Sequence, residues 1–230
     1  MAPGKVICIS GIDTDIGKSI ATGLLGRYLL GLGRSVTTQK ICQTGCVGIS
    51  EDLCTHRRLM DLDLQPEDRE GLTCPYIFKE PCSPHLAARL EGKTMDLRRI
   101  TAATDELRRR YDYVLLEGVG GLMVPLQQDV LLADYLSEHD YTHVLVSCSR
   151  LGSINHTLAA MEILARRKME IAGIIYNRFM DTNEAIAEDT RRCIAHFMRT
   201  WGMDGAIVDM PPTEDVAAIQ VDFSGFFLPE

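Results

Sequence analysis

Short apolar runs alternate with helical patterns along most of this 230-residue chain. Runs this short suit buried strands better than helices. Their alternation with helices predicts βαβ units, and therefore an α/β fold with a mostly parallel central sheet covered by helices on both faces. We expect a single domain over residues 1–230, which is long enough for a full core. The predicted strands are residues 6–9, 35–39, 113–116, 143–147, 171–176 and 206–208, and the predicted helices are residues 20–30, 97–110, 131–138, 154–167 and 185–200.

The loop after the first predicted strand ends in Gly17-Lys18-Ser19. Main-chain N–H groups in such a loop, together with the dipole of the following helix, bind phosphate. Lys18 would then reach the β- and γ-phosphates, and the Ser19 hydroxyl would ligate Mg²⁺. Five residues separate Gly11 from Gly17, one more than the strict Walker pattern allows. A plain strand–turn–helix is the alternative, but the flanking strand and helix favour a single-domain P-loop NTPase-type fold.

Two other predicted strands lead into charged residues that would face the same edge of the sheet. Glu117 follows the strand at 113–116 and precedes several glycines, as expected for a carboxylate that holds Mg²⁺ beside a P-loop. Lys40 follows the second strand and could bind a substrate anion or a transferring phosphoryl group. A flexible turn at Glu117 and a solvated surface lysine at Lys40 are the alternatives. Asp52 is similar, since a carboxylate early in a helix is commonly only a partner of the helix dipole.

Composition and charge exclude several classes of partner. The net charge is −8, and the short clusters of arginine and lysine sit late in predicted helices, so we expect no nucleic-acid partner. No apolar stretch is long enough to cross a bilayer, so we expect no membrane partner. The eight cysteines contain no Cys-x-x-Cys pair, and no signal peptide precedes the first strand. We therefore expect reduced thiols and a cytoplasmic location.

Five motifs, taken together, resemble one family. The extended loop Gly-x-Asp-Thr-x-x-Gly-Lys-Ser at residues 11–19 is similar to the P-loop of the dethiobiotin synthetases, whose own spacing has the extra residue. The remaining matches occur in the family's order as far as about residue 178. They are Lys40-x-x-Gln43-Thr44-Gly45, Glu80-Pro81-Cys82-Ser83-Pro84-His85, Glu117-Gly118-x-Gly120-Gly121 and Leu151-Gly152-Ser153-Ile154-Asn155-His156.

The resemblance implies an ATP- and Mg²⁺-dependent cyclo-ligase of biotin biosynthesis that works as a homodimer. Its substrates would be 7,8-diaminononanoate and CO₂, and its products dethiobiotin, ADP and phosphate. One amine captures CO₂ as a carbamate, whose oxygen attacks the γ-phosphate to give a carbamic–phosphoric anhydride. The second amine then closes the ureido ring as phosphate leaves. Positioning and charge neutralisation would supply most of the rate.

The resemblance also implies roles for individual residues. Lys18 and Lys40 would be catalytic, with Lys40 on the carbamate and the γ-phosphate. Nucleotide would contact Thr14, Asp15, Ile16, Gly17, Lys18, Ser19, Ile20, Gly118, Val119 and Gly120, with adenine at Asn177, Arg178, Pro211 and Glu214. Mg²⁺ would be held by Ser19, Glu117 and Asp52, with Glu51 as the alternative to Asp52.

Two sets of residues would hold the diamine. Thr14 and Thr44 would contact its head, and its carboxylate would bind Gly152, Ser153, Ile154 and Asn155 of the neighbouring subunit. A helix start at Ser153 would offer free N–H groups to such an anion. Simple helix capping is the alternative for Ser153 and Asn155, and a turn residue that ends a strand is the alternative for Asn177.

Two rival functions remain open at this point. A ParA/MinD-like ATPase, which is a nucleotide-switched binding protein, typically carries a second lysine inside its P-loop, and residues 11–17 contain none. An inactive paralogue would keep the fold for a binding role, and the presence of Lys18, Ser19, Lys40 and Glu117 argues against it.

Overall fold

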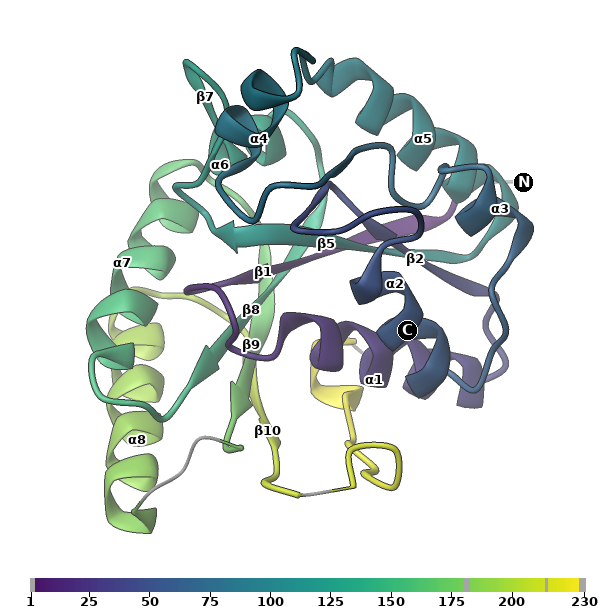
Figure 1. Ribbon diagram of the computed structural model, residues 1–230. Helices are drawn as coiled ribbons and strands as arrows, with labels where there is room; N and C mark the ends of the chain where they lie inside the picture. Colours follow the sequence, from purple (N-terminus) through teal and green to yellow (C-terminus); the bar gives the residue numbers. More distant parts are fainter. Residues whose placement is uncertain (1–2, 180–182, 214, 228–230) are drawn as a thin grey trace.

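Six parallel strands form the central sheet of the computed structural model, which describes residues 3–179, 183–213 and 215–227 (Figure 1). The strand order is β10-β9-β8-β1-β5-β2, and every neighbouring pair is parallel. The α/β fold class predicted from the sequence is confirmed. The strands are β1 (Lys5–Gly11), β2 (Val36–Lys40), β5 (Tyr113–Gly121), β8 (Thr142–Cys148), β9 (Ile171–Asn177) and β10 (Ala206–Met210).

The sheet is covered on both faces, as the almost continuous burial of its strands requires. Figure 1 shows α1 and α2 on one side of the sheet and α5 and α6 on the other. The C-terminal segment with the short 3₁₀ turn η1 (Ser224–Phe226) joins α1, where Tyr28 packs against Phe223 and Phe227. The longer helices are α1 (Lys18–Gly31), α2 (Glu51–Leu59), α5 (Leu97–Arg110), α7 (Ser153–Arg166) and α8 (Glu184–Thr200), and α6 is Leu132–Ser137.

Strand β5 is longer than the sequence predicts. The predicted strand stopped at residue 116, so that Glu117 would stand at its end, whereas β5 continues to Gly121. Glu117 still pairs in the ladder with Lys40 of β2 and Ile9 of β1. The glycines after it accept extended backbone as readily as a turn, which is why the sequence suggested a loop.

The segment after β2 is more regular than the sequence indicates. Residues 41–71 read as the least regular part of the chain, yet they contain α2 and the one-turn helix α3 (Pro66–Arg69). The sequence places Asp52 early in a helix but does not predict the extent of α2, because this helix buries His56 and Arg57, where an amphipathic helix would present apolar side chains. The remaining short elements are β3 (Gln43–Thr44), β4 (Ile77–Phe78), α4 (Pro84–Leu90), β6 (Pro125–Gln127) and β7 (Val130–Leu131).

No helix in the described part of the chain has the length and hydropathy of a membrane span.

Candidate functional site

The loop between β1 and α1 has the geometry of a phosphate cradle. Gly17 adopts a left-handed conformation (φ 93°, ψ 23°) and is the N-cap of α1, so the free N–H groups of the first helical turn face the end of the sheet. The Lys18 side chain is buried, and its Nζ donates to the Asp13 carbonyl oxygen at 2.5 Å. Burial, together with the nearby charge of Lys40, lowers the pKa of Lys18 to about 8.

Asn177, the last residue of β9, is attached to this loop. Its Nδ2 donates to the Ile16 carbonyl oxygen at 2.9 Å, and its Oδ1 accepts from the main-chain N–H of Phe179 at 3.0 Å. A Cβ atom at Gly17 would stand 2.5 Å from the same Nδ2. Gly17 is therefore required both by its backbone angle and by the close approach of Asn177.

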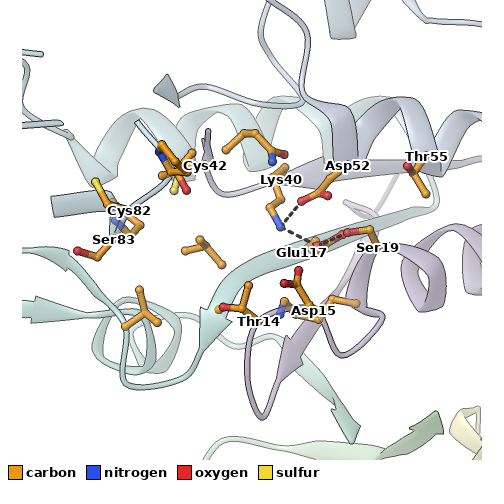
Figure 2. Close-up of a pocket in the computed structure, with 18 of the residues that line it drawn as sticks. Thr14, Asp15, Ser19, Lys40, Cys42, Asp52, Thr55, Cys82, Ser83 and Glu117 are labelled. Carbon is orange, nitrogen blue, oxygen red and sulfur yellow. Dashed lines mark hydrogen bonds and ion pairs between the residues drawn. The ribbon is translucent and has the colours of Figure 1, made fainter. Parts of the chain in front are cut away.

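A buried ion cluster lies across from the loop, where β2 and β5 pair (Figure 2). Lys40 Nζ lies 2.6 Å from Glu117 Oε1, 2.6 Å from Asp52 Oδ2 and 3.0 Å from the Gly118 carbonyl oxygen. Ser19 Oγ, from the start of α1, donates to the same Glu117 Oε1 at 2.9 Å. One ammonium group thus joins two carboxylates from α2 and β5.

The ionisation states of this cluster follow from its contacts. Burial alone would lower the pKa of Lys40, but Glu117 and Asp52 outweigh it and hold that pKa above its ordinary value. Burial alone would raise the pKa of Glu117, but Lys40 and His56 hold that pKa well below its ordinary range. At neutral pH the cluster therefore contains a charged ammonium and a charged Glu117 carboxylate.

The loop and the ion cluster line one cavity of about 770 Å³. Figure 2 shows Lys40 between Asp52 and Glu117, with Thr14 and Asp15 on the opposite side and Cys42, Cys82 and Ser83 at one end. Most of the predicted site residues line this cavity. They are Thr14, Asp15, Gly17, Lys18, Ser19, Ile20, Lys40, Thr44, Asp52, Glu117, Val119 and Gly120.

The other predicted site residues lie outside the lining. Ile16 is fully buried beneath the loop, and Gly118 presents only its carbonyl to Lys40. Glu51, the alternative to Asp52, is exposed, whereas Asp52 contacts Lys40. The predicted adenine residues Asn177, Arg178 and Pro211 and the predicted carboxylate residues Gly152, Ser153, Ile154 and Asn155 do not line the cavity, and Glu214 lies outside the described residues.

The start of α7 has a buried polar atom that no described residue contacts by a hydrogen bond. Gly152 is the N-cap (φ 91°), and no side chain caps this helix. Ser153 is buried, and its Oγ has no hydrogen-bond partner among the described residues, so the helix-capping alternative for Ser153 is wrong. Asn155 is exposed, and the neighbouring Leu151 is completely exposed.

Sequence reasoning missed several side chains of this site. The most important is His56 of α2, whose Nε2 lies 2.6 Å from Glu117 Oε2. Its position one helical turn after Asp52 was the available signal, because residues four apart share a helix face. The lining residues that were not predicted are Cys42, Gln43, Thr55, Pro81, Cys82, Ser83, Pro84 and Val124.

The oxygen donors of the cavity fit a small hard cation. Ser19 offers a hydroxyl, and Asp52 and Glu117 offer carboxylates that approach the same Lys40 Nζ. Mg²⁺ prefers such oxygen ligands and commonly takes only one or two carboxylates, with nucleotide phosphates and water completing its shell. Over the described ranges, no group of three or more His, Cys, Asp or Glu residues could hold a metal by itself.

Comparison with known sequences gives close relatives over most of the chain. The family model described as AAA domain matches residues 5–216. The chain is 51% identical to the ATP-dependent dethiobiotin synthetase BioD of Chlorobaculum tepidum, over 90% of this chain and 87% of that protein. It is 48% identical to the ATP-dependent dethiobiotin synthetase BioD 2 of Pasteurella multocida, over 86% of this chain and 91% of that protein.

Comparison with solved structures gives the same fold at low identity. The MinC:MinD cell division protein complex of Aquifex aeolicus matches with a TM-score of 0.58 and 16% identity, over 92% of this chain and 83% of that chain. The ParA family ATPase from Chlorobium tepidum matches with a TM-score of 0.55 and 16% identity, over 93% and 87% of the two chains. Identity this low supports the P-loop fold and carries nothing about function.

Proposed function

Because this chain belongs to the AAA domain family and to the ATP-dependent dethiobiotin synthetases, which are ligases of biotin biosynthesis, we propose that it closes the ureido ring of dethiobiotin. The proposed substrates are 7,8-diaminononanoate, CO₂ and ATP. The observation that supports this reaction best is Lys40, an ammonium held 2.6 Å from both Asp52 and Glu117 in the cavity that the phosphate loop also lines.

The proposed reaction has three steps. One amine of the diamine adds to CO₂ and loses a proton, which gives a carbamate. A carbamate oxygen attacks the γ-phosphorus, the bond to ADP breaks, and a carbamic–phosphoric anhydride forms. The second amine attacks the carbonyl carbon, loses a proton and expels phosphate, which closes the ring.

Two lysines and the loop would serve these steps by charge and position. Lys18 would bind the β- and γ-phosphates together with the main-chain N–H groups of residues 14–20. Lys40 would lie beside the carbamate and the γ-phosphate and offset the negative charge that develops between them. Thr14 and Thr44, which both line the cavity, would contact the head of the diamine. Val119 and Gly120, also in the lining, and Gly118 would contact the nucleotide.

Mg²⁺ would be held by the side-chain oxygens of Ser19, Asp52 and Glu117, three residues that line the cavity. When bound, it would neutralise phosphate charge and orient the γ-phosphate for attack. We propose that adenine lies beyond the loop, near Asn177, Arg178, Pro211 and Glu214.

We further propose a homodimer in which each cavity is completed by the partner. Residues 152–155 do not line the cavity of their own chain, yet Ser153 Oγ is buried with no hydrogen-bond partner in the described part of the chain, at a helix N-terminus where a carboxylate would bind. The fully exposed Leu151 beside it is an apolar side chain suited to a subunit interface.

Mixing two defective variants tests this arrangement. Lys40→Ala and Ser153→Asp should each lack activity, since Asp would repel the substrate carboxylate. Mixed and re-equilibrated, they should recover roughly a quarter of wild-type activity, because half of the dimers then carry one site free of both changes. Failure to recover activity, with mixed dimers present by mass spectrometry, would show that residue 153 serves its own chain.

We also propose that residues 1–230 act as one domain and that the protein works in the cytoplasm. All eight cysteines are free thiols, which suits a reducing compartment.

The reaction is tested by omitting each substrate in turn. ADP release should require both 7,8-diaminononanoate and bicarbonate, and dethiobiotin should form in equal amount to ADP. ATP turnover that is indifferent to the diamine would contradict the ligase assignment and favour a nucleotide-switched ATPase. Absence of ATP binding would instead favour an inactive paralogue.

A further inference from the structure

His56 is buried completely at the back of the ion cluster. Its Nε2 lies 2.6 Å from Glu117 Oε2, and its Nδ1 lies 3.0 Å from the Thr38 hydroxyl oxygen. Both ring nitrogens are therefore occupied, one by a charged carboxylate and one by a hydroxyl. The other carboxylate oxygen, Glu117 Oε1, is the one that contacts Lys40 and Ser19.

The direction of the first of these hydrogen bonds follows from charge. Glu117 is ionised, so its Oε2 can only accept, and His56 Nε2 must carry the proton that it donates. A tautomer with a bare Nε2 would place two lone pairs against each other at 2.6 Å. His56 therefore holds one oxygen of Glu117, and the carboxylate cannot rotate without breaking a short, buried hydrogen bond.

A chain of buried hydrogen bonds holds His56 in turn. Thr38 Oγ1, which contacts His56, accepts from Arg57 Nη1 at 2.9 Å. Arg57 forms two bonds to Asp68, through Nε at 2.8 Å and Nη2 at 2.7 Å. Thr73 Oγ1 donates to Asp68 at 2.7 Å, and the Thr73 carbonyl accepts from the Lys40 main-chain N–H at 2.7 Å. The network thus starts at Glu117 and returns to Lys40.

We propose that His56 is a positioning residue that fixes the orientation of Glu117, and through it the affinity of the cavity for the divalent cation of the nucleotide. The proposal rests on the proposed role of Glu117 as a metal ligand. His56 itself does not line the cavity, so it acts through Glu117 and not on the substrates.

The physical reason is that Glu117 is fully buried and carries a full charge. Without the imidazole, Oε2 would lose its only hydrogen bond in the described part of the chain, and the carboxylate would turn toward the remaining donors, Lys40 and Ser19. Lys40 and Ser19 both line the cavity that is proposed to hold the nucleotide. Loss of an outer hydrogen bond of this kind typically weakens metal binding about 10- to 100-fold.

The experiment measures Mn²⁺ binding to the protein–ADP complex by electron paramagnetic resonance, and ADP binding without metal by calorimetry. His56→Leu should weaken Mn²⁺ binding about 10- to 100-fold and leave metal-free ADP binding nearly unchanged. His56→Gln, whose amide can replace the Nε2 donor, should recover much of the loss. Thr38→Val, which removes the hydroxyl behind the ring, should show a smaller loss of the same kind.

Two controls keep the result specific. Cys54→Ser changes an exposed residue of the same helix, and His143→Leu removes another buried imidazole that lies on β8. Neither should change Mn²⁺ binding. If His56→Leu folds poorly, the Thr38→Val variant carries the test, and Mn²⁺ binding of wild-type strength in that variant would count against the proposal.

Wild-type Mn²⁺ affinity in folded His56→Leu would overturn the proposal. Equal losses of Mn²⁺ and of metal-free ADP binding would also overturn it, since they would mean a general defect of the fold. Neither readout needs turnover, so a wild-type protein that binds Mn²⁺ and ADP but forms no dethiobiotin would contradict the proposed function and leave the role of His56 intact.

Discussion

The two walls of the cavity differ in the chemical groups that they present, main-chain amides on one and charged side chains on the other. The phosphate loop, residues 11–19, presents main-chain N–H groups and depends on a left-handed Gly17. The ion-pair wall, which we define as Lys40, Asp52 and Glu117 with His56 behind them, presents charged side chains of β2, α2 and β5 that are tied together by Lys40. Both walls meet at Ser19, whose hydroxyl donates to Glu117.

This difference determines how each wall responds to substitution. A main-chain wall loses little when a side chain changes, except where the backbone requires glycine. A wall of buried charges is sensitive to each member, because removing one partner leaves another charge buried without compensation, at a cost of about 3–5 kcal/mol. The loop therefore suits the invariant task of holding phosphate, and the ion-pair wall suits the task of neutralising charge that changes during a reaction.

The largest expected effect comes from Lys40→Ala. Turnover should fall about 10²- to 10³-fold, since a preorganised charge at the reacting groups is lost. ADP binding, measured by calorimetry, should stay close to wild type, because the phosphate loop is untouched. Lys93→Ala, which removes an exposed lysine paired with Glu91, is the matched control and should change neither quantity. Normal turnover in Lys40→Ala would mean that the ion-pair wall does not act on the reaction.

A second prediction compares two buried histidines, His56 beside the ion-pair wall and His143 on β8. His56 has partners on both nitrogens, whereas His143 has none among the described residues, and burial lowers the pKa of His143 to about 4. As the pH falls, this histidine takes up a proton in the unfolded chain, where its pKa is near 6.5, before it does so in the folded chain. Stability from this group is complete above about pH 6.5 and is lost as the pH falls toward 4, by about 3 kcal/mol.

Urea unfolding at pH 7.5 and pH 5.0 measures this loss. His143→Leu should remove most of the difference between the two pH values, relative to wild type. A wild-type decline that persists unchanged in His143→Leu would show that other groups carry the acid sensitivity.

A third effect tests the geometric requirement of the loop. Gly17→Ala and Gly33→Ala both place a side chain at a positive φ (93° and 75°), which destabilises by about 1–2 kcal/mol. Only at Gly17 does the added Cβ meet another group, Asn177 Nδ2, whose hydrogen bond to Ile16 must then give way. Gly17→Ala should therefore unfold about 1 kcal/mol more easily than Gly33→Ala and also lose ADP affinity.

A double-mutant cycle separates the contact from the backbone. Combining Gly17→Ala with Asn177→Ala should produce less than the sum of the single losses in urea unfolding. Additive losses would mean that the two residues do not interact.

The smallest expected effect concerns the start of α7, which belongs to neither wall. Ser153→Ala should raise the KM for the diamine about fivefold, the value of one hydrogen bond near 1 kcal/mol, with little change in stability or in the KM for ATP. Ser149→Ala is the matched control, since its Oγ is also buried without a partner in the described residues. Equal changes in both variants would contradict a specific role for Ser153.

The same contrast explains how much of the molecule the sequence could predict. The phosphate loop was predictable because its signals are local: a strand, glycines at fixed positions and a following helix. The strands of the sheet were predictable because their signals are local too: most are short apolar runs, although β2 (Val36–Lys40) also carries Thr37, Thr38 and Gln39. Lys40 and Glu117 were predictable as neighbours because the carboxyl ends of parallel strands meet at one edge.

The rest of the ion-pair wall depends on contacts between distant segments. His56 and Arg57 are polar residues that α2 turns inward, so a search for apolar periodicity passes over this helix. Their partners Thr38, Asp68 and Glu117 lie up to 61 positions away in the chain. The extension of β5 beyond Glu117 also depends on long-range pairing with β1 and β2.

The account is tested most directly by following oxygen from bicarbonate. With ¹⁸O-labelled bicarbonate, 7,8-diaminononanoate and ATP, mixed rapidly to limit exchange with water, the phosphate released with dethiobiotin should carry one ¹⁸O atom. The label reaches phosphate when an oxygen that came from bicarbonate attacks the γ-phosphate, and a requirement for the diamine assigns that oxygen to the carbamate rather than to bicarbonate itself. Phosphate without label, released at the same rate when the diamine is omitted, would contradict the account.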